Sequence, residues 1–467
     1  MNECGKTFDI FQAENDMTKI MAVLCLCCLL SGSQSPQIDR AALADEIENT
    51  LANNVLHAWY PRIVNEQHGG FYTNFDAQWR RLENQDKMIV TQARDVWTAA
   101  KAALLYPDDA RYRHAADHGF AALKTIMWDS TYGGFYQSRG EAGGKASDGY
   151  GDEKRSYGNA FGLYAVSAYY ELTRDPQALK FAQQIFHWIE DHAYDPQYGG
   201  YWQFLRRDGS VIHKRQKSVG WDSTELGLKD QNTSIHTLEA YTELYKVWPD
   251  AQVRQRLQSL LFIIRDKITS ETGYMRLFFY PDWTPVSHRD SSETYIRKHV
   301  RLDHVSFGHD IETAYLMLEA SHTLGLNHDE RTLAVAQKMV DHVLAQGWDK
   351  KYGGIFDVGY YFKGDDHVTI LTREKSWWAQ MEAMNALLMM SLLYPEEKKY
   401  AEHFAEQWRF IDHYLVDHKN GGIYSRPADY NDKAKLARKA GAWKGPYHTS
   451  RALMNCVRML RQNEVPF

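Results

Sequence analysis

Apolar residues in the body of the chain recur with a helical period. Within residues 233–248 they fall on one broad face, at Ile235, Leu238, Tyr241, Leu244, Tyr245 and Trp248. Residues 310–324 repeat the pattern and end at Gly325, a residue type that favours the position just past a helix. Proline cannot continue a helix, and several predicted helices end in an aromatic residue followed by proline and an acid, at Tyr106, Trp248 and Tyr394. The pattern predicts a chain of amphipathic helices joined by short connections.

A second signature, glycine beside aromatic residues, recurs roughly every 70 residues. The fourth copy is degenerate, and the six copies begin at His68, Tyr132, Tyr198, Thr272, Tyr352 and Asn420. Two glycines next to aromatic residues indicate a tight turn that enters a short strand. Each unit is therefore predicted to contain a helix, a turn, a second helix and a Gly-Gly hairpin.

Six such units predict an all-α fold, an (α/α)6 barrel in which six helical hairpins close into a toroid with short Gly-Gly-aromatic β-hairpins in the loops. An open HEAT-type solenoid is the alternative, but its repeats are shorter, about 40–47 residues. Length alone would suggest about three domains. Because the repeat runs through the whole body, we expect residues 36–467 to form a single domain.

Composition narrows the class of protein. Apolar residues make up 44% and charged residues 24% of the chain, as in ordinary globular proteins. The net charge of −6 gives no basic excess for nucleic acid or an anionic membrane. Four of the five cysteines precede residue 29 and Cys456 stands alone in the body, which excludes a disulfide framework or a cysteine-based metal site there. The 13% of aromatic residues suits a sugar-facing cleft, although a large core also takes many.

The first 35 residues have the outline of a secretory signal peptide. Lys19 precedes an apolar run at residues 20–30, and small residues follow it. The run is too short for a stable membrane span, and we expect none after residue 35. The acidic stretch before Met17 suggests that translation starts at Met17. We expect a periplasmic or secreted protein if 17–35 is a leader, and a cytoplasmic one otherwise.

Residues that carry chemistry occupy equivalent places in the units, again roughly 70 residues apart. Each lies in or just before the first turn of the first helix of its predicted pair, and the six are Arg94, Tyr157, His236, His309, Trp378 and His448. In a toroid, six such helix starts meet at one mouth. Glu239 and Glu312 follow His236 and His309 at i+3, which places each carboxylate on the same helix face as its histidine.

Three histidines at one mouth favour proton transfer near neutral pH, because the ordinary imidazole pKa is about 6.5. Removing a proton from the carbon next to an aldehyde creates an enediolate, which Arg94 can stabilise. Inverting that carbon takes a base on one face and an acid on the other. Two alternatives stay open: histidines at helix starts are often only capping or packing residues, and His-x-x-Glu pairs can bind metals.

Four segments resemble the N-acylglucosamine 2-epimerase superfamily, nearest the cellobiose 2-epimerase branch: NTSIHTLEAYTELYKVW, SFGHDIETAYLMLE, SWWAQMEAMNALL and WKGPYHTSRALM. The resemblance covers roughly residues 38–462. It implies an (α/α)6 barrel and reversible epimerisation at C2 of a reducing-end aldose, through ring opening and a cis-enediolate, without metal or other cofactor.

The resemblance also implies roles for individual residues. His309 and His448 would be the acid and base on opposite faces of C2, and His448 would assist ring opening. His236 would act near O1 and O2 with Arg94, while Glu312 would support His309 or the substrate. The pocket would be lined by Tyr157, Asn232, Trp377 or Trp378, and Trp443.

The substrate is predicted from a departure within the family. Residues 286–305 form a longer loop than we expect in cellobiose-type members. This loop looks like the mannose 2-epimerase branch and favours D-mannose and D-glucose as substrates. The alternatives are cellobiose or mannobiose epimerisation, aldose–ketose isomerisation, and a glycoside hydrolase that uses carboxylates such as Asp222, Glu225 and Glu312. We expect a monomer or homodimer whose partner is a small sugar.

Overall fold

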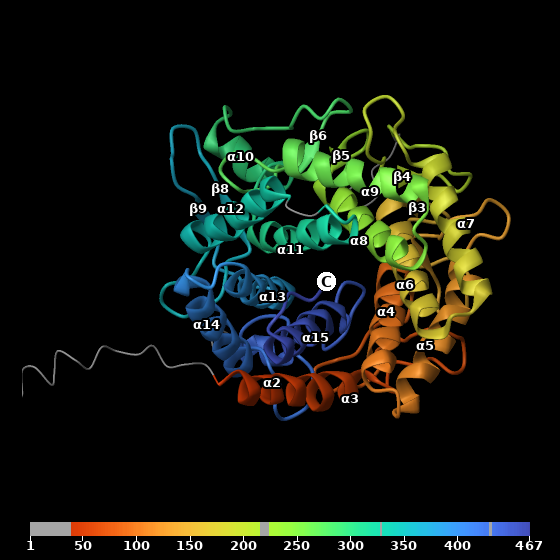
Figure 1. The fold of residues 1–467 in the computed structure, drawn as a ribbon. Helices are drawn as coiled ribbons and strands as arrows, with labels where there is room; N and C mark the ends of the chain where they lie inside the picture. Colours follow the sequence, from red (N-terminus) through yellow and green to blue (C-terminus); the bar gives the residue numbers. More distant parts are fainter. Residues whose placement is uncertain (1–38, 215–223, 327–328, 429–431) are drawn as a thin grey trace, which may run out of the picture. The chain divides into compact units, whose positions relative to one another are not determined.

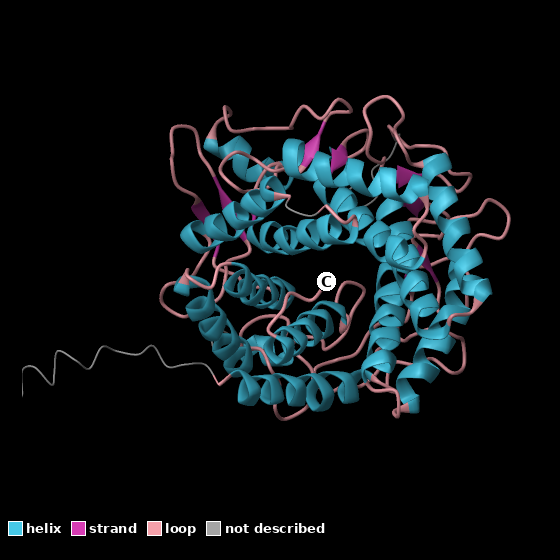
Figure 2. Ribbon diagram, in the orientation of Figure 1, coloured by secondary structure: helices cyan, strands magenta, loops and turns pink. Residues whose placement is uncertain are grey.

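The computed structural model describes residues 39–214, 224–326, 329–428 and 432–467, and its contacts divide the chain into two units, Met1–Leu43 and Ala44–Phe467. The larger unit is built from two layers of helices (Figures 1 and 2). The inner layer consists of α4 (Ile89–Leu105), α6 (Ser156–Thr173), α8 (Gln231–Val247), α11 (Phe307–Thr323), α13 (Trp377–Leu393) and α15 (Tyr447–Gln462). The outer layer includes α5 (Ala110–Ala122), α7 (Pro176–His192), α9 (Ala251–Ile263), α12 (Glu330–Gln346) and α14 (Lys398–Tyr414).

The inner helices form a closed ring. Each packs on the next around the ring, and α15 packs back on α4. Each of the first five also packs against the outer helix that follows it in the chain. The sixth pair joins α15 to η1 (Thr50–Leu56), which lies between α2 (Arg40–Asn49) and α3 (His57–Trp59). The predicted (α/α)6 barrel is confirmed.

Short antiparallel strands fix the beginnings of four inner helices. The two-stranded pairs are β1 (Lys87–Met88) with β2 (Ser138–Arg139), β3 (Lys154–Arg155) with β4 (Phe204–Leu205), and β5 (Lys229–Asp230) with β6 (Phe278–Phe279). A three-stranded sheet contains β7 (Val305–Ser306), β8 (Val358–Tyr360) and β9 (Thr369–Thr372). In each case the strand that leads into an inner helix pairs with a strand that follows the next outer helix. The remaining short elements are η2 (Leu123–Met127), η4 (Ile264–Ile268), α10 (Glu293–His299), η5 (Val300–Leu302) and η6 (Asp432–Leu436).

The Gly-Gly signatures are the predicted tight turns. The five Gly-Gly pairs of these signatures, and Gly273 of the degenerate copy, have φ between +64° and +99°, a region that glycine enters without steric cost. The backbone then returns antiparallel to the end of the outer helix, so that Trp128 pairs with Phe135 and Tyr194 with Tyr201.

A buried lysine closes four of these turns. Asp195, for example, accepts from the backbone N–H of Gln197 in its own turn (2.9 Å) and pairs with Lys229 Nζ (2.7 Å), which also donates to the Gly199 carbonyl (2.7 Å). The same arrangement joins Lys154 to Asp129 and Lys375 to Asp349, and Lys439 pairs with Asp417 in the last turn. Each lysine comes from the next unit of the barrel, so these pairs connect neighbouring units at the end where the inner helices begin.

Replacing Lys229 with methionine is expected to lower the free energy of unfolding by about 3–5 kcal/mol, because Asp195 is left as a buried, unpaired charge. Burial alone would raise the pKa of Asp195, but Lys229 and the turn N–H groups lower it. Urea titration followed by circular dichroism measures the effect. Lys180→Met, at an exposed position of α7, is the control and should change stability by less than about 0.5 kcal/mol. A Lys229→Met cost below that of the control would contradict a structural role.

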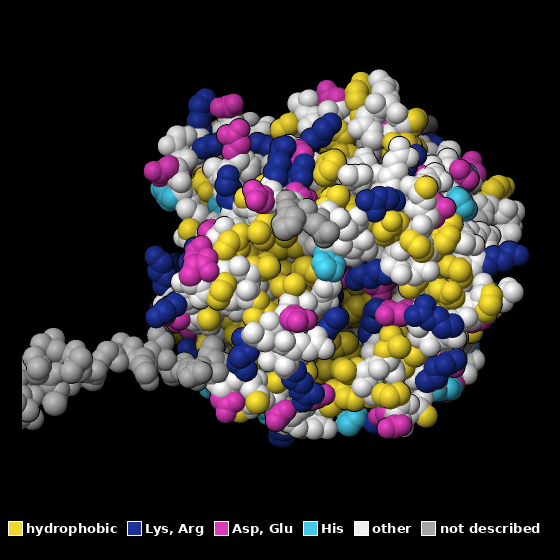
Figure 3. Space-filling model, viewed as in Figure 1, with side chains coloured by type: hydrophobic (Ala, Val, Ile, Leu, Met, Phe, Trp, Pro, Cys, Tyr) yellow, Lys and Arg dark blue, Asp and Glu magenta, His cyan; other side chains and the backbone are white. Residues whose placement is uncertain are grey.

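The opposite end of the ring holds a cavity of about 460 Å³ near the C-terminus of the chain. The face in Figure 3 shows a hollow in which side chains of both charges lie. Lys101 there pairs with Glu243 at 2.5 Å, and Lys246 pairs with Glu319 at 2.7 Å. Arg451 also lines this cavity. Among the described residues no helix has the length and apolar character needed to span a membrane.

Candidate active site

The beginnings of the inner helices bring the predicted residues together. Tyr157, Trp378 and His448 are the second residues of α6, α13 and α15, and His309 is the third residue of α11. Arg94 and His236 lie in the second turn, one turn deeper than expected, because α4 and α8 begin earlier. The α8 start is fixed by Asp230, whose carboxylate accepts from the Thr233 N–H at 2.6 Å.

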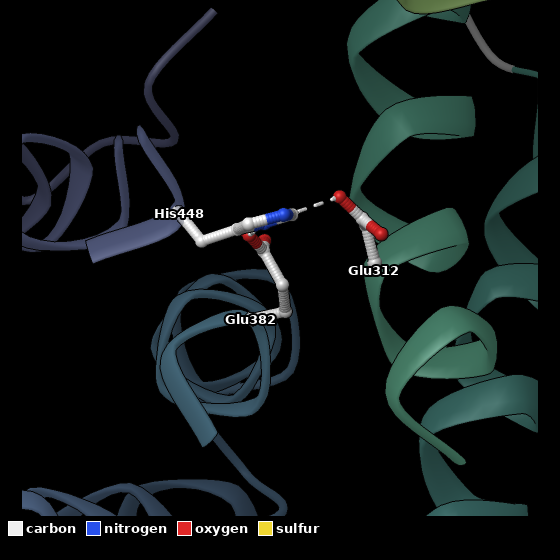
Figure 4. A group of neighbouring side chains, drawn as sticks. All are labelled: Glu312, Glu382 and His448. Carbon is white, nitrogen blue, oxygen red and sulfur yellow. Dashed lines mark hydrogen bonds and ion pairs between the residues drawn. The ribbon is translucent and has the colours of Figure 1, made fainter. Parts of the chain in front are cut away.

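His448 sits between two buried carboxylates from other helices. Its Nδ1 lies 2.7 Å from Glu382 Oε1 and 3.8 Å from Glu312 Oε1. Figure 4 shows the imidazole on α15 facing Glu382 from α13 and Glu312 from α11. An imidazole that binds a carboxylate through Nδ1 keeps Nε2 for a substrate.

His309 has a different partner. Its Nδ1 lies 2.7 Å from the Ser306 hydroxyl at the end of β7, whereas Glu312, the residue expected to support it, lies beside His448. The Trp378 ring contacts both histidines, with centroid distances of 4.7 Å to His309 and 5.6 Å to His448. Gly308 makes room for that ring, since a Cβ there would lie 2.6 Å from it.

His236 and Arg94 form the neighbouring wall. His236 Nδ1 lies 2.8 Å from Glu239 Oε2, and its ring packs on Phe161 and Tyr157. Arg94 donates to the Tyr157 hydroxyl at 3.1 Å and lies 4.2 Å above the Phe161 ring. Its Nε is buried without a hydrogen-bond partner, which leaves a donor for a ligand.

Sequence reasoning missed Arg451 and Glu382. The Arg451 guanidinium contacts Glu312 Oε1 at 2.6 Å and Glu382 Oε1 at 2.7 Å, and it also donates to Glu239. The one local signal is spacing, because Arg451 follows His448 at i+3 and Glu382 follows Trp378 at i+4, which places each pair on one helix face. That spacing does not show which groups face them across the ring.

Burial and positive neighbours keep two of the imidazoles neutral. Burial, then His236, His304, His448 and Arg94, lower the pKa of His309 to about 3. Burial and Arg94 also hold the pKa of His448 well below its usual range, against the opposing effect of Glu312.

The carboxylates divide into two kinds. Burial alone would raise the pKa of Glu239, but Arg451 and His236 lower it to about 2. Burial raises the pKa of Glu382 despite Arg451. Burial therefore shifts both members of the Glu382–His448 pair toward their neutral forms.

Glu312, Glu382 and His448 place one potential metal-ligand atom each within 4.8 Å of the others. Arg451 Nη2 donates to Oε1 of both glutamates, whereas their Oε2 atoms are buried without a hydrogen-bond partner. A guanidinium at this place supplies the positive charge that a divalent ion would otherwise bring.

Three of the predicted pocket residues remain, and of these Trp443 is exposed. Trp443 is 55% exposed and its ring lies 6.3 Å from Tyr157, and the ring of Trp377 faces Lys444 Nζ at 5.5 Å. Asn232 Oδ1 is buried without a hydrogen-bond partner. Of the carboxylates considered for a hydrolase, Glu225 pairs with Arg301 at 2.5 Å, and Asp222 lies outside the described residues, as does the predicted leader in residues 1–35.

Comparison with known proteins places this site in a family. The model of N-acylglucosamine 2-epimerase matches residues 70–452. The chain belongs to the N-acylglucosamine 2-epimerase family. It is 30% identical to a cellobiose 2-epimerase of Bacteroides fragilis over 90% of this chain and 98% of that protein, and 23% identical to a D-mannose isomerase of Marinomonas mediterranea over 90% and 97%. The solved cellobiose 2-epimerase of Spirochaeta thermophila superposes with a TM-score of 0.76 at 27% identity, covering 92% of this chain and 99% of that one.

Family membership confirms the resemblance noted from the sequence motifs. This member of the N-acylglucosamine 2-epimerase family is an enzyme of the carbohydrate epimerase class.

Proposed function

We propose that the enzyme interconverts D-mannose and D-glucose by removing and returning the proton at C2. The observation that carries this proposal is the pair of imidazoles, buried His448 and half-buried His309, that contact one Trp378 ring. Two bases from different helices beside one apolar surface suit a reaction that exchanges a proton on both faces of a single carbon.

The open-chain aldose lies with C1 and C2 between these imidazoles. One neutral histidine accepts the C2 proton, and the electron pair moves onto the aldehyde oxygen to give a cis-enediolate. Arg94 and His236 stabilise the charge on O1 and O2 by donating hydrogen bonds. The opposite histidine donates a proton to the other face of C2, which completes the inversion, and His448 also assists ring opening and closure.

The charged groups supply the proton that the second step needs. The three carboxylates of Glu239, Glu312 and Glu382 contact the Arg451 guanidinium, and Arg94 is the other arginine of the site, which leaves one negative charge. One additional proton, held by the Glu382–His448 pair, neutralises it. His448 can then donate from Nε2 while Nδ1 takes up the proton from Glu382, and His309 acts as the base. In the reverse direction the two sides exchange roles.

Residues 286–305 support a monosaccharide substrate. They contain α10 and are fastened by Arg301 to Glu225 (2.5 Å) and by Asp303 to the Tyr360 hydroxyl (2.8 Å). This segment runs into β7, three residues before His309, and its length is the feature that favours a monosaccharide over a disaccharide. The named relatives make cellobiose the second candidate.

Incubation with mannose in D2O tests the proposal. We expect glucose that carries deuterium at C2 by NMR, kcat/KM at least about 10-fold higher for mannose than for cellobiose, and full activity after treatment with EDTA. Fructose as the main product would show isomerisation instead, a preference for cellobiose would reverse the substrate assignment, and loss of activity to EDTA would refute the metal-free mechanism.

We also propose that a leader within residues 1–35 exports the enzyme and that residues 36–467 form one catalytic domain. The apolar run at residues 20–30 supports the first statement, and the barrel repeat supports the second.

A further inference from the structure

We propose that Arg451 is a positioning residue that holds the acid–base pair in its working geometry by binding one glutamate from each of three helices. This inference rests on the proposed roles of His309 and His448. Arg451 touches no substrate in this scheme; it acts through the carboxylates that hold two of the three histidines.

The contacts of Arg451 connect the two halves of the site. Nη1 donates to Glu239, which binds His236, and Nη2 contacts Glu382, which binds His448. Nη2 also lies 2.6 Å from Glu312 Oε1, the second carboxylate beside His448. Because α8, α11 and α13 each supply one of these glutamates, a single side chain fixes groups that lie far apart in the sequence.

Only a planar guanidinium fits this arrangement. Its two terminal nitrogens reach different carboxylates at once, whereas an ammonium is a point charge on a flexible stem. Arg451 is 3% exposed and also lines the cavity at the other end of the ring, so it forms the floor between the site and that cavity. Without it, three buried carboxylates would repel one another at the centre of the barrel.

Arg451 also sets the protonation of the pair. The titratable and charged groups around His448 include Glu382 on α13, Glu312 and His309 on α11, His236 on α8, Arg94 on α4 and Arg451 on α15 itself. The positive charge of Arg451 lowers the pKa of both His448 and Glu382. Removing Arg451 should therefore raise both pKa values and move the part of the pH profile that each group controls to higher pH.

The test compares Arg451→Met, Arg451→Lys and the wild type by the pH dependence of kcat/KM. For Arg451→Met we expect the pKa contributed by the Glu382–His448 pair to rise by about 1–3 units and kcat to fall at least about 100-fold, with KM changed less than kcat. Arg451→Lys keeps the positive charge but loses the planar guanidinium with its two terminal nitrogens. We therefore expect kcat to fall while the pKa contributed by the Glu382–His448 pair changes by less than about one unit. If Arg451→Met does not fold, Arg451→Lys still tests the geometry.

Arg458→Met on the same helix is the matched control, because Arg458 is exposed and binds Gln462 Oε1 at 3.0 Å; we expect wild-type kinetics. An unchanged pH profile in a folded Arg451→Met, or a near-normal kcat in Arg451→Lys, would overturn the inference. Deuterium incorporation at C2 by the wild-type enzyme is measured in the same series, so that failure of the proposed function is seen separately from failure of this inference.

Discussion

Replacing His309 or His448 with alanine is expected to lower kcat by at least about 1000-fold, since each substitution removes the proton carrier on one face of C2. The helical circular dichroism should stay that of the wild type, because both side chains lie at helix starts and contribute few contacts to the packing between the layers. Epimer formation from mannose, followed by NMR, measures the loss.

The two variants should also differ from each other in D2O. An enzyme that keeps one base can still exchange the C2 proton of one epimer, although it cannot complete the inversion. We therefore expect each variant to exchange the C2 proton of a different sugar, mannose in one case and glucose in the other. His114→Ala, on the exposed surface of α5, is the control and should leave all rates unchanged. A near-normal rate in either active-site variant would show that the acid–base assignment is wrong.

The fold could be predicted from the sequence because both of its signals are local and repeated. Helical periodicity depends on neighbouring residues, and the Gly-Gly turns need a positive φ that glycine supplies at little cost. The closure of six units then follows from their number and length. The convergence of Arg94, His236, His309 and His448 was predictable for the same reason, since a repeated position in a closed ring faces a common centre.

The charged core of the site could not be predicted, because it depends on contacts between units. Arg451 resembles any arginine on an amphipathic helix until the ring places Glu239, Glu312 and Glu382 around it. Ser306 could not be recognised as the partner of His309 because a serine before a helix normally serves as a cap. Lys229 has no local signal either, since its aspartate lies in the preceding unit.

Replacing Glu382 with glutamine is the second change with a large expected effect, and it separates charge from shape. The amide oxygen of the introduced glutamine can still accept from Arg451 Nη2 and His448 Nδ1, which lie 2.7 Å from the present Oε1 of Glu382. The amide can neither hold a proton for His448 nor favour the imidazolium. We expect kcat to fall about 100- to 1000-fold with little change in KM or stability. Glu402→Gln, at an exposed position of α14, is the matched control and should leave kcat unchanged.

The pH dependence of kcat/KM shows whether Glu382 and Arg451 raise or lower the pKa of His448. In the wild type the pKa values of His309 and His448 lie below the usual 6.5, so kcat/KM should stay constant as the pH falls through 6.5. The neutral amide of Glu382→Gln stabilises the His448 imidazolium less than a carboxylate does. The pKa that His448 contributes to the profile should therefore move to lower pH. Arg451→Met should move it in the opposite direction, because that substitution removes a positive charge. If both substitutions moved this pKa in the same direction, or if neither moved it, the buried carboxylate and guanidinium would not control the protonation of His448.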